Sequence, residues 1–394
     1  MSLNLDRSTW KRVKLGDVVL RSRAQADPFK GDVGRYVAGG HIDTDSVIIS
    51  RSGDVADGQM GSTFHYFFKP GQVLFVSARP YLRKTGIPDF AGVVADKTYV
   101  LEAVPGNGLL HDMLPFLLTS DRFVEYATQE ATGSMNPRLL WSAMQRYEFD
   151  QPPLDEQKRI AELLWALERH QLTLTLCHDA LSKSATELRR GVLEARSWDG
   201  HLGEALRGIT AGRSLAATSV PATADTFGVL KVSAVGGNGF VGSENKQLLD
   251  QSGFLPQFTI RKGDLLITRA NTAAYVGRPA IVDADYPHLM LSDKTLRLEI
   301  EPSVASAQFL QECLLAPRTR TAIAEVATGT GAAMKNITQA EIRALPMPRF
   351  SLHEQKKFLH AVARVSEAMN RVTEEHVALS TLKSGLLSGI FGDN

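Results

Sequence analysis

Residues 152–193 read PPLDEQKRIAELLWALERHQLTLTLCHDALSKSATELRRGVL. After the two prolines, apolar side chains recur at every seventh residue, at Ile160, Leu167, Leu174, Leu181 and Leu188. Apolar residues at this interval form one stripe along a helix, and a stripe held over several heptads is typical of a coiled coil. The stretch therefore predicts a long coiled-coil helix, with Asp155-Glu156 placed at the positive end of its dipole.

A second segment near the C-terminus repeats this pattern at one constant offset. Its apolar positions are Phe358, Val365, Val372, Leu379 and Leu386. A single helix cannot bury a one-sided stripe alone, and the two stripes have the same length. The second helix must start from the domain in which the first helix ends. We therefore expect the two helices to pack on each other as an antiparallel pair.

The regions that precede the two helices also match each other. The matched segments are Lys69–Val76 with Arg261–Thr268, Asp96–Thr98 with Asp293–Thr295, and Ala131–Ser134 with Ala327–Thr330. This many matches in one order indicate a tandem duplication. Each region combines short β-type runs, set between Gly and Pro residues, with helical stretches, a combination that predicts a mixed α+β domain.

These patterns together predict an α+β fold with two homologous mixed α/β domains. The domains are separated by a long antiparallel coiled coil of two helices, and intramolecular pseudo-twofold symmetry relates the two copies. The expected boundaries are 1–152 for the first domain, 153–196 for the central helical spacer, 197–350 for the second domain and 351–394 for the C-terminal helical spacer.

The composition excludes several classes of protein. Of the 394 residues, 43% are hydrophobic, which is enough for ordinary globular cores. Cys177 and Cys313 match neither a disulfide framework nor a zinc site, so we expect no metal. No apolar run reaches the roughly 18 residues that span a bilayer, and the N-terminus lacks the apolar core of a secretory signal. We therefore expect a cytoplasmic protein without membrane contact.

This organisation resembles the DNA-specificity (S) subunits of type I restriction–modification systems, and the resemblance covers essentially the whole chain. In that family, each of two target-recognition domains is followed by a helical spacer that opens with a Pro-Pro-Leu-x-Glu-Gln-x-x-Ile phrase. Here the phrase is complete at 152–160 and degraded at 348–358. The resemblance implies a subunit that binds double-stranded DNA at a bipartite, asymmetric site and docks two methyltransferase subunits, which restriction/translocase subunits join. It also implies no cofactor on this chain, with S-adenosylmethionine on the methyltransferase.

The candidate DNA contacts come from two kinds of segment. In members of the family, the loop that leaves a central strand lies against DNA, and here it corresponds to residues 77–84 and 268–278. Arg and Asn pair bidentately with guanine and adenine edges, whereas small segments after Thr132 and Thr328 offer backbone N–H groups to phosphate. The candidates are Ser77, Arg79, Tyr81, Arg83, Lys84, Ser134, Arg138, Thr268, Arg269, Asn271, Arg278, Thr330 and Lys335. For residues 77–84 and 268–278 the alternative is a solvated loop whose cations only hold phosphates or salt bridges, and for the small segments it is a plain loop between two helices.

The main alternative function is a non-catalytic interaction scaffold, in which two domains on a helical rod bind a partner other than DNA. Near-equal charge, 44 Lys+Arg against 43 Asp+Glu, does not separate the two functions, because DNA binding depends on local patches. We do not expect an enzyme. The sequence lacks the Asn/Asp-Pro-Pro-aromatic motif that would hold a flipped adenine, and the duplicated plan leaves no room for a separate catalytic domain.

Overall fold

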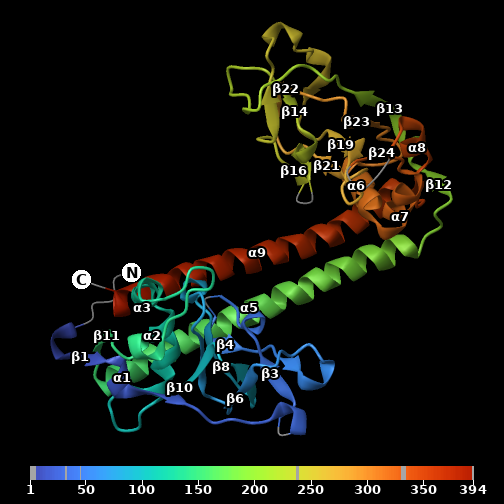
Figure 1. Ribbon diagram of the computed structural model, residues 1–394. Coiled ribbons are helices and arrows are strands. Elements are labelled where there is room, and N and C mark those ends of the chain that lie inside the picture. Colours follow the sequence, from blue (N-terminus) through green and yellow to red (C-terminus); the bar gives the residue numbers. More distant parts are fainter. Residues whose placement is uncertain (1–5, 32, 45, 237–238, 330–333, 393–394) are drawn as a thin grey trace. The chain divides into compact units, whose positions relative to one another are not determined.

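The computed structural model describes residues 6–31, 33–44, 46–236, 239–329 and 334–392. The chain divides into two compact units (Figure 1). The first unit comprises Met1–His178 with Arg371–Asn394, and the second comprises Asp179–Asn370. Because both long helices cross these boundaries, each unit contains a mixed α/β domain and one part of either helix.

The two long helices are α5 (Leu154–Glu194) and α9 (Leu352–Phe391). The side chains of the predicted apolar stripe are buried or half-buried along both helices. Ile160, Leu167, Leu174, Phe358 and Leu386 are buried. Leu181, Leu188, Val365, Val372 and Leu379 are half-buried. Among the described residues, no helix has the length and apolar character that crossing a lipid bilayer would require.

A buried glutamine in the first turn of each long helix ties the helix to the domain before it. The Gln157 side chain accepts a hydrogen bond from Leu110 N at 2.7 Å and donates one to Gly108 O at 2.7 Å. Gln355 makes the equivalent pair of bonds in the second unit, at 3.1 and 2.7 Å. Since both side chains are buried, their removal would leave backbone groups unsatisfied. The Glu-Gln step of the sequence therefore fixes where each helix leaves its domain.

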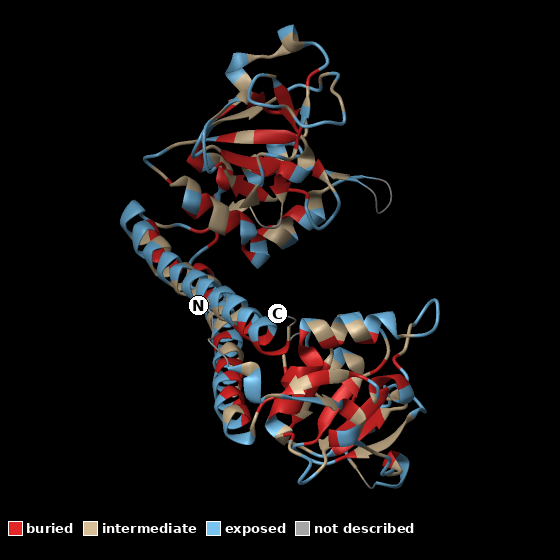
Figure 2. Ribbon diagram, turned by 90° about the vertical axis from the view of Figure 1, so that its left-hand side faces the viewer, coloured by how far each residue is buried: buried red, intermediate tan, exposed pale blue. Residues whose placement is uncertain are grey.

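Figure 2 shows that the buried residues of each unit continue from the domain onto the helices. In the first unit, Leu164 of α5 and Ile390 of α9 belong to the same cluster as Phe116 and Phe123. In the second unit, Leu193 of α5 and Phe358 of α9 share a cluster with the domain's own core residues. The helices are therefore parts of both hydrophobic cores. Burial of one such apolar side chain contributes about 1.5–3 kcal/mol to the free energy of folding.

The domain of the first unit contains two main sheets. One has five strands in the order β2-β10-β7-β8-β4, and the other has four in the order β5-β3-β9-β6. The strands are β1 (Lys11–Lys14), β2 (Val19–Ser22), β3 (Arg35–Val37), β4 (Ile48–Ile49), β5 (Gly53–Asp54), β6 (Phe64–Phe68), β7 (Val73–Val76), β8 (Thr85–Pro88), β9 (Gly92–Ala95), β10 (Thr98–Ala103) and β11 (Glu148–Gln151). The short helices are α1 (Leu15–Val18), α2 (Leu114–Thr119), α3 (Asp121–Gln129) and α4 (Trp141–Met144).

The domain of the second unit has main sheets in the orders β13-β23-β19-β21 and β17-β14-β22-β18. Its strands are β12 (Gly200–His201), β13 (Leu206–Ala211), β14 (Gly228–Leu230), β15 (Val235–Gly236), β16 (Gly239–Phe240), β17 (Asn245–Gln247), β18 (Thr259–Ile260), β19 (Leu265–Thr268), β20 (Ala270–Asn271), β21 (Pro279–Ile281), β22 (Tyr286–Met290), β23 (Thr295–Ile300), β24 (Lys335–Asn336) and β25 (Pro346–Met347). The helices are α6 (Ala307–Leu315), α7 (Pro317–Val326) and α8 (Gln339–Ala344).

The two domains repeat one topology. In the first sheet of each, β7 and β10 pair antiparallel as β19 and β23 do. In the second sheet, the central pairs β3–β9 and β14–β22 are both parallel. The central strand pairs of both sheets therefore correspond between the two domains, although the first sheet has five strands in one domain and four in the other.

One ion pair is buried between α5 and α9 in the first unit. The carboxylate of Glu168 accepts a hydrogen bond from the Lys383 ammonium group, and both side chains are less than a tenth exposed. The second Glu168 oxygen accepts a hydrogen bond from Val47 N at 3.3 Å, which ties α5 to the sheet domain. At the next turn, Gln171 Nε2 donates to Ser380 Oγ at 2.8 Å. These contacts fix the register of the two helices within this unit.

We expect Lys383→Ala to destabilise the first unit by about 3–5 kcal/mol, because it leaves the Glu168 carboxylate buried without a cation. The double variant Glu168→Gln/Lys383→Met removes both charges and keeps an acceptor for Val47 N. Urea unfolding should place the double variant within about 2 kcal/mol of the parent chain. A double variant as unstable as the single one would show that the buried charges are not the dominant interaction here.

Candidate nucleic-acid interface

The two kinds of segment that the sequence singles out lie next to each other in the first unit. We call residues 77–84 exit loop 1 and residues 132–138 hairpin loop 1. Hairpin loop 1 is closed by two backbone hydrogen bonds between Thr132 and Arg138, at 3.0 and 2.8 Å. It is joined to exit loop 1 by bonds from Leu139 N to Ser77 O at 2.9 Å and from Arg79 N to Pro137 O at 2.7 Å. The two loops therefore form one surface.

The second unit joins its loops in the same way. We call residues 268–278 exit loop 2, and we call residues 328–329 and 334–336 together hairpin loop 2. Two backbone bonds between Thr328 and Asn336, at 3.0 and 2.8 Å, close the hairpin loop. Ile337 N then donates to Arg269 O at 2.9 Å, and β20 pairs with β24 across the two loops. The predicted contact Thr330 lies outside the described residues.

Exit loop 1 has an unusual backbone. Arg79 and Arg83 have φ angles of 52° and 54°, and they are the non-glycine residues with positive φ among those described. A left-handed conformation costs a non-glycine residue about 1 kcal/mol or more, so the surrounding contacts must hold the loop in this shape. Strain of this kind is found at functional sites more often than elsewhere.

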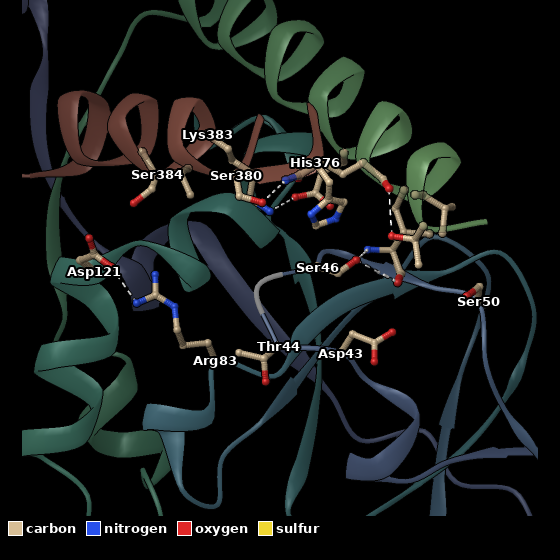
Figure 3. A pocket seen from close by; sticks show the side chains of 16 residues that line it. Asp43, Thr44, Ser46, Ser50, Arg83, Asp121, His376, Ser380, Lys383 and Ser384 are labelled. Carbon is tan, nitrogen blue, oxygen red and sulfur yellow. Dashed lines mark hydrogen bonds and ion pairs between the residues drawn. The ribbon is translucent and has the colours of Figure 1, made fainter. Parts of the chain in front are cut away.

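The side chain of Arg83 supplies part of that support. Its guanidinium group donates to Asp121 Oδ1 and to Thr119 O, both at 2.7 Å. Figure 3 shows Arg83 pointing towards Asp121 at the edge of a cavity that Ser380 and Lys383 of α9 also line. Arg83 is therefore engaged within the first unit, where it anchors the exit loop.

Three other predicted contacts of the first unit also face inward. Ser77 is fully buried, and its hydroxyl group donates to Lys97 O at 2.7 Å. Arg138 Nε donates to Ser77 Oγ at 3.1 Å, and the guanidinium group lies 5.7 Å from the centre of the Tyr99 ring. The ammonium group of Lys84 donates to Gly39 O. These side chains build the framework of the loops.

In the second unit, several of the predicted contacts are likewise engaged within the protein. Thr268 is buried, donates to Tyr275 O and accepts from Arg278 N at 3.1 Å. Arg278 is half-buried with its guanidinium group 5.8 Å from the Tyr275 ring, and Lys335 Nζ donates to Gly329 O at 3.1 Å. Arg320 supports the same loop by donating to Val276 O at 2.8 Å. Burial lowers the pKa of Arg320, and the nearby charge of Arg278 lowers it further.

Most of the remaining predicted side chains face solvent. In the first unit these are Arg79, Ser134 and Tyr81, of which Tyr81 is 49% exposed. In the second unit Arg269 is exposed, whereas Asn271 is half-buried and its Oδ1 accepts a hydrogen bond from Thr272 N. One arginine of each exit loop, Arg79 or Arg269, is thus presented outward on a framework of buried polar contacts.

The candidate set omitted three residues that lie on these surfaces. Lys97 accepts hydrogen bonds from Ser77 N and Oγ through its carbonyl, and Lys294 accepts one from Arg269 N at 2.8 Å. Both lysines belong to the repeated Asp-Lys-Thr segment, so the duplication itself was a usable signal. Met135 at the tip of hairpin loop 1 is 88% exposed. No pattern of period or charge marks this residue in the sequence.

The candidate surface carries polar and cationic groups that are suited to binding. Within the described ranges, no group of three or more His, Cys, Asp or Glu side chains is placed to hold a metal ion. Arg79 and Arg269 can donate two parallel hydrogen bonds to a base edge or a phosphate.

Arg79 allows the backbone and the side chain to be tested separately. We expect Arg79→Gly to be more stable than Arg79→Ala by about 1 kcal/mol, because glycine accepts the positive φ and alanine does not. Both variants lose the guanidinium group. Urea unfolding measures the difference, and equal stabilities would show that the left-handed conformation carries no strain.

Comparison with known proteins identifies proteins similar to this chain. Residues 7–176 match the family described as type I restriction modification DNA specificity domain. The chain is also similar to the specificity subunit of the type I restriction enzyme EcoEI from Escherichia coli. The two are 31% identical over 147 residues, which cover 37% of this chain and 25% of that subunit. The match thus spans about a quarter of the length of that relative.

Two solved structures share the fold along the whole chain. One, from work on the complex assembly and conformational transition of a type I restriction–modification system, has a TM-score of 0.58 at 21% identity and covers 98% of both chains. The other is a type I restriction–modification S subunit from M. genitalium, with a TM-score of 0.60 at 14% identity over 100% of both chains. At these identities the structural likeness shows the fold alone, whereas the family match is a similarity of sequence in residues 7–176. Residues 7–176 are therefore similar to the type I restriction modification DNA specificity domain, and the chain as a whole shares the fold of these two structures.

Proposed function

We propose that the chain reads a bipartite, asymmetric DNA site, with one half-site recognised by each domain. The observation that carries this proposal is the pairing of exit loop and hairpin loop, which recurs in both units and presents Arg79 in one and Arg269 in the other. An outward guanidinium group on a rigid framework suits guanine, whose O6 and N7 accept two parallel hydrogen bonds.

The proposed asymmetry rests on what the two surfaces present. Exit loop 1 offers Arg79 and Tyr81, whereas exit loop 2 offers Arg269 with Asn271 beside it. Because the frameworks are alike and the presented side chains differ, the two domains would bind different base sequences. Ser77, Arg83, Lys84, Arg138 and Thr268 act in this proposal as supports of the loops, not as contacts to bases.

The long helices would set the distance between the half-sites. We infer an antiparallel coiled coil, flanked by domains at 1–152 and 197–350, with intramolecular pseudo-twofold symmetry. The contacts Glu168–Lys383 and Gln171–Ser380 support the direction, since residue numbers rise on one helix as they fall on the other. The 41 residues of α5 are about 60 Å long at ~1.5 Å per residue. That length exceeds the ~34 Å between half-sites one turn of DNA apart.

The partners of the proposal are double-stranded DNA and two methyltransferase subunits, which restriction/translocase subunits would join. Members of this family are non-catalytic, and S-adenosylmethionine would be held by the methyltransferase. The near-neutral charge supports shared DNA contact, because a chain that gripped the backbone alone would be expected to be basic. With chromosomal DNA as the proposed substrate, we expect the complex to act in the cytoplasm.

The proposal predicts separable defects in the two half-sites. In the assembled methyltransferase complex, Arg79→Ala should relax recognition within one half-site and Arg269→Ala within the other, each by about 1–3 kcal/mol at the affected base pair. Sequencing of the methylated motifs made by each variant measures the change.

The matched controls are Arg12→Ala and Arg207→Ala, because both are exposed arginines held in surface ion pairs on other strands. They should leave both half-sites unchanged. If the two loop variants relaxed the same half-site, or neither, the assignment of one half-site to each domain would be wrong. A chain that binds methyltransferase but no DNA would favour the scaffold function.

A further inference from the structure

Three lysines line a cleft on the domain of the second unit. The cleft has a volume of about 320 Å³ and is lined by Lys231, Lys246 and Lys294, together with Asp293. The lysines come from three separate elements: Lys231 follows β14, Lys246 lies on β17, and Lys294 lies in the turn between β22 and β23. Residues far apart in the sequence thus bring their positive charges to one place.

The cleft carries more basic than acidic side chains. Among the ion pairs of the described residues, Lys231 has a partner in Glu244 at 3.8 Å, whereas Lys246 and Lys294 have none. The Glu244 carboxylate already accepts a hydrogen bond from the Ser233 hydroxyl group. The three lysines outnumber the two carboxylates near them, Asp293 and Glu244, and this excess of positive charge favours a role in binding an anion.

The cleft adjoins the surface proposed to read DNA. Lys294 O accepts the hydrogen bond from Arg269 N at 2.8 Å, so the turn that forms one wall of the cleft is bonded directly to exit loop 2. A duplex seated on Arg269 would therefore carry its phosphates past this wall. The partner that the position and the charge fit is the DNA backbone next to the base pairs that exit loop 2 contacts.

The fold itself does not require these lysines. In the first unit, the residue after β3 is Ala38, where Lys231 follows β14 in the second. Gly53 pairs with the middle residue of β3, as Lys246 pairs with the middle residue of β14. Of the three lysines, Lys294 alone has a counterpart, Lys97. The same sheets form without the other two charges, so the cleft is a feature of the second domain.

We propose that Lys231, Lys246 and Lys294 bind phosphate groups of the DNA backbone beside the half-site read by the second domain. This inference rests on the proposed function. It makes the second domain the source of more sequence-independent affinity than the first. Each phosphate neutralised by a lysine releases a counterion, which steepens the dependence of binding on salt by about 0.9 in log–log slope.

The test uses the assembled complex with its methyltransferase subunits and two duplexes, one with the methylated motif and one with its bases scrambled. The variant K231Q/K246Q/K294Q is compared with K30Q/K69Q/K262Q, which removes the same three charges at exposed lysines outside the cleft. Dissociation constants are measured between 50 and 200 mM salt. Thermal unfolding of both variants establishes that they are folded.

The cleft variant should show a log–log slope shallower by about 2–3 and at least tenfold weaker binding at 0.1 M salt, by an equal factor for both duplexes. The control variant should keep the parent slope within about 1. Equal slopes for the two variants would overturn the phosphate cleft while leaving DNA recognition intact, and so would a loss confined to the motif duplex. A parent complex that binds neither duplex would overturn the proposed function itself.

Discussion

The fold depends on the fact that neither long helix can bury its apolar stripe alone. Within the first unit, the start of α5 is covered by the last turns of α9, so residues 371–391 complete a core whose other members precede residue 179. The second unit is built in the same way: Leu193, near the end of α5, and Phe358, near the start of α9, belong to one hydrophobic cluster. The two domains are thereby bound to segments distant in sequence, and the chain folds as two units that share both helices.

A second constraint is the separation of framework from presented side chain. In each domain, a buried polar side chain, Ser77 or Thr268, forms hydrogen bonds that hold the exit loop. Backbone hydrogen bonds to the hairpin loop hold it as well. The residues beside the outward arginine can then differ between the two domains while the loop keeps its conformation. Such a division allows one fold to present different binding surfaces, as the proposed function requires.

The sequence predicts the regular parts of this structure well, because heptad spacing and the Glu-Gln step each have a local physical cause. It does not reveal which loop side chains form hydrogen bonds within the protein. Arg83, Lys84 and Arg138 were candidates for DNA contact because they are cations in the right segment, yet their partners Thr119, Gly39 and Ser77 come from elsewhere in the chain. Likewise, the sequence around Lys383 does not reveal its ion pair with Glu168 until the register of the two helices is known. Only tertiary contacts decide whether a cation supports a loop or faces a ligand.

The central claim is that this chain gives a methyltransferase its bipartite DNA target. Single-molecule methylation sequencing of host DNA tests it most directly, with and without the gene for this chain and with the partner methyltransferase expressed in both strains. The account predicts that one methyladenine motif, made of two different half-sites around a fixed gap, disappears when the gene is deleted. An unchanged methylome in the presence of the expressed methyltransferase would contradict it.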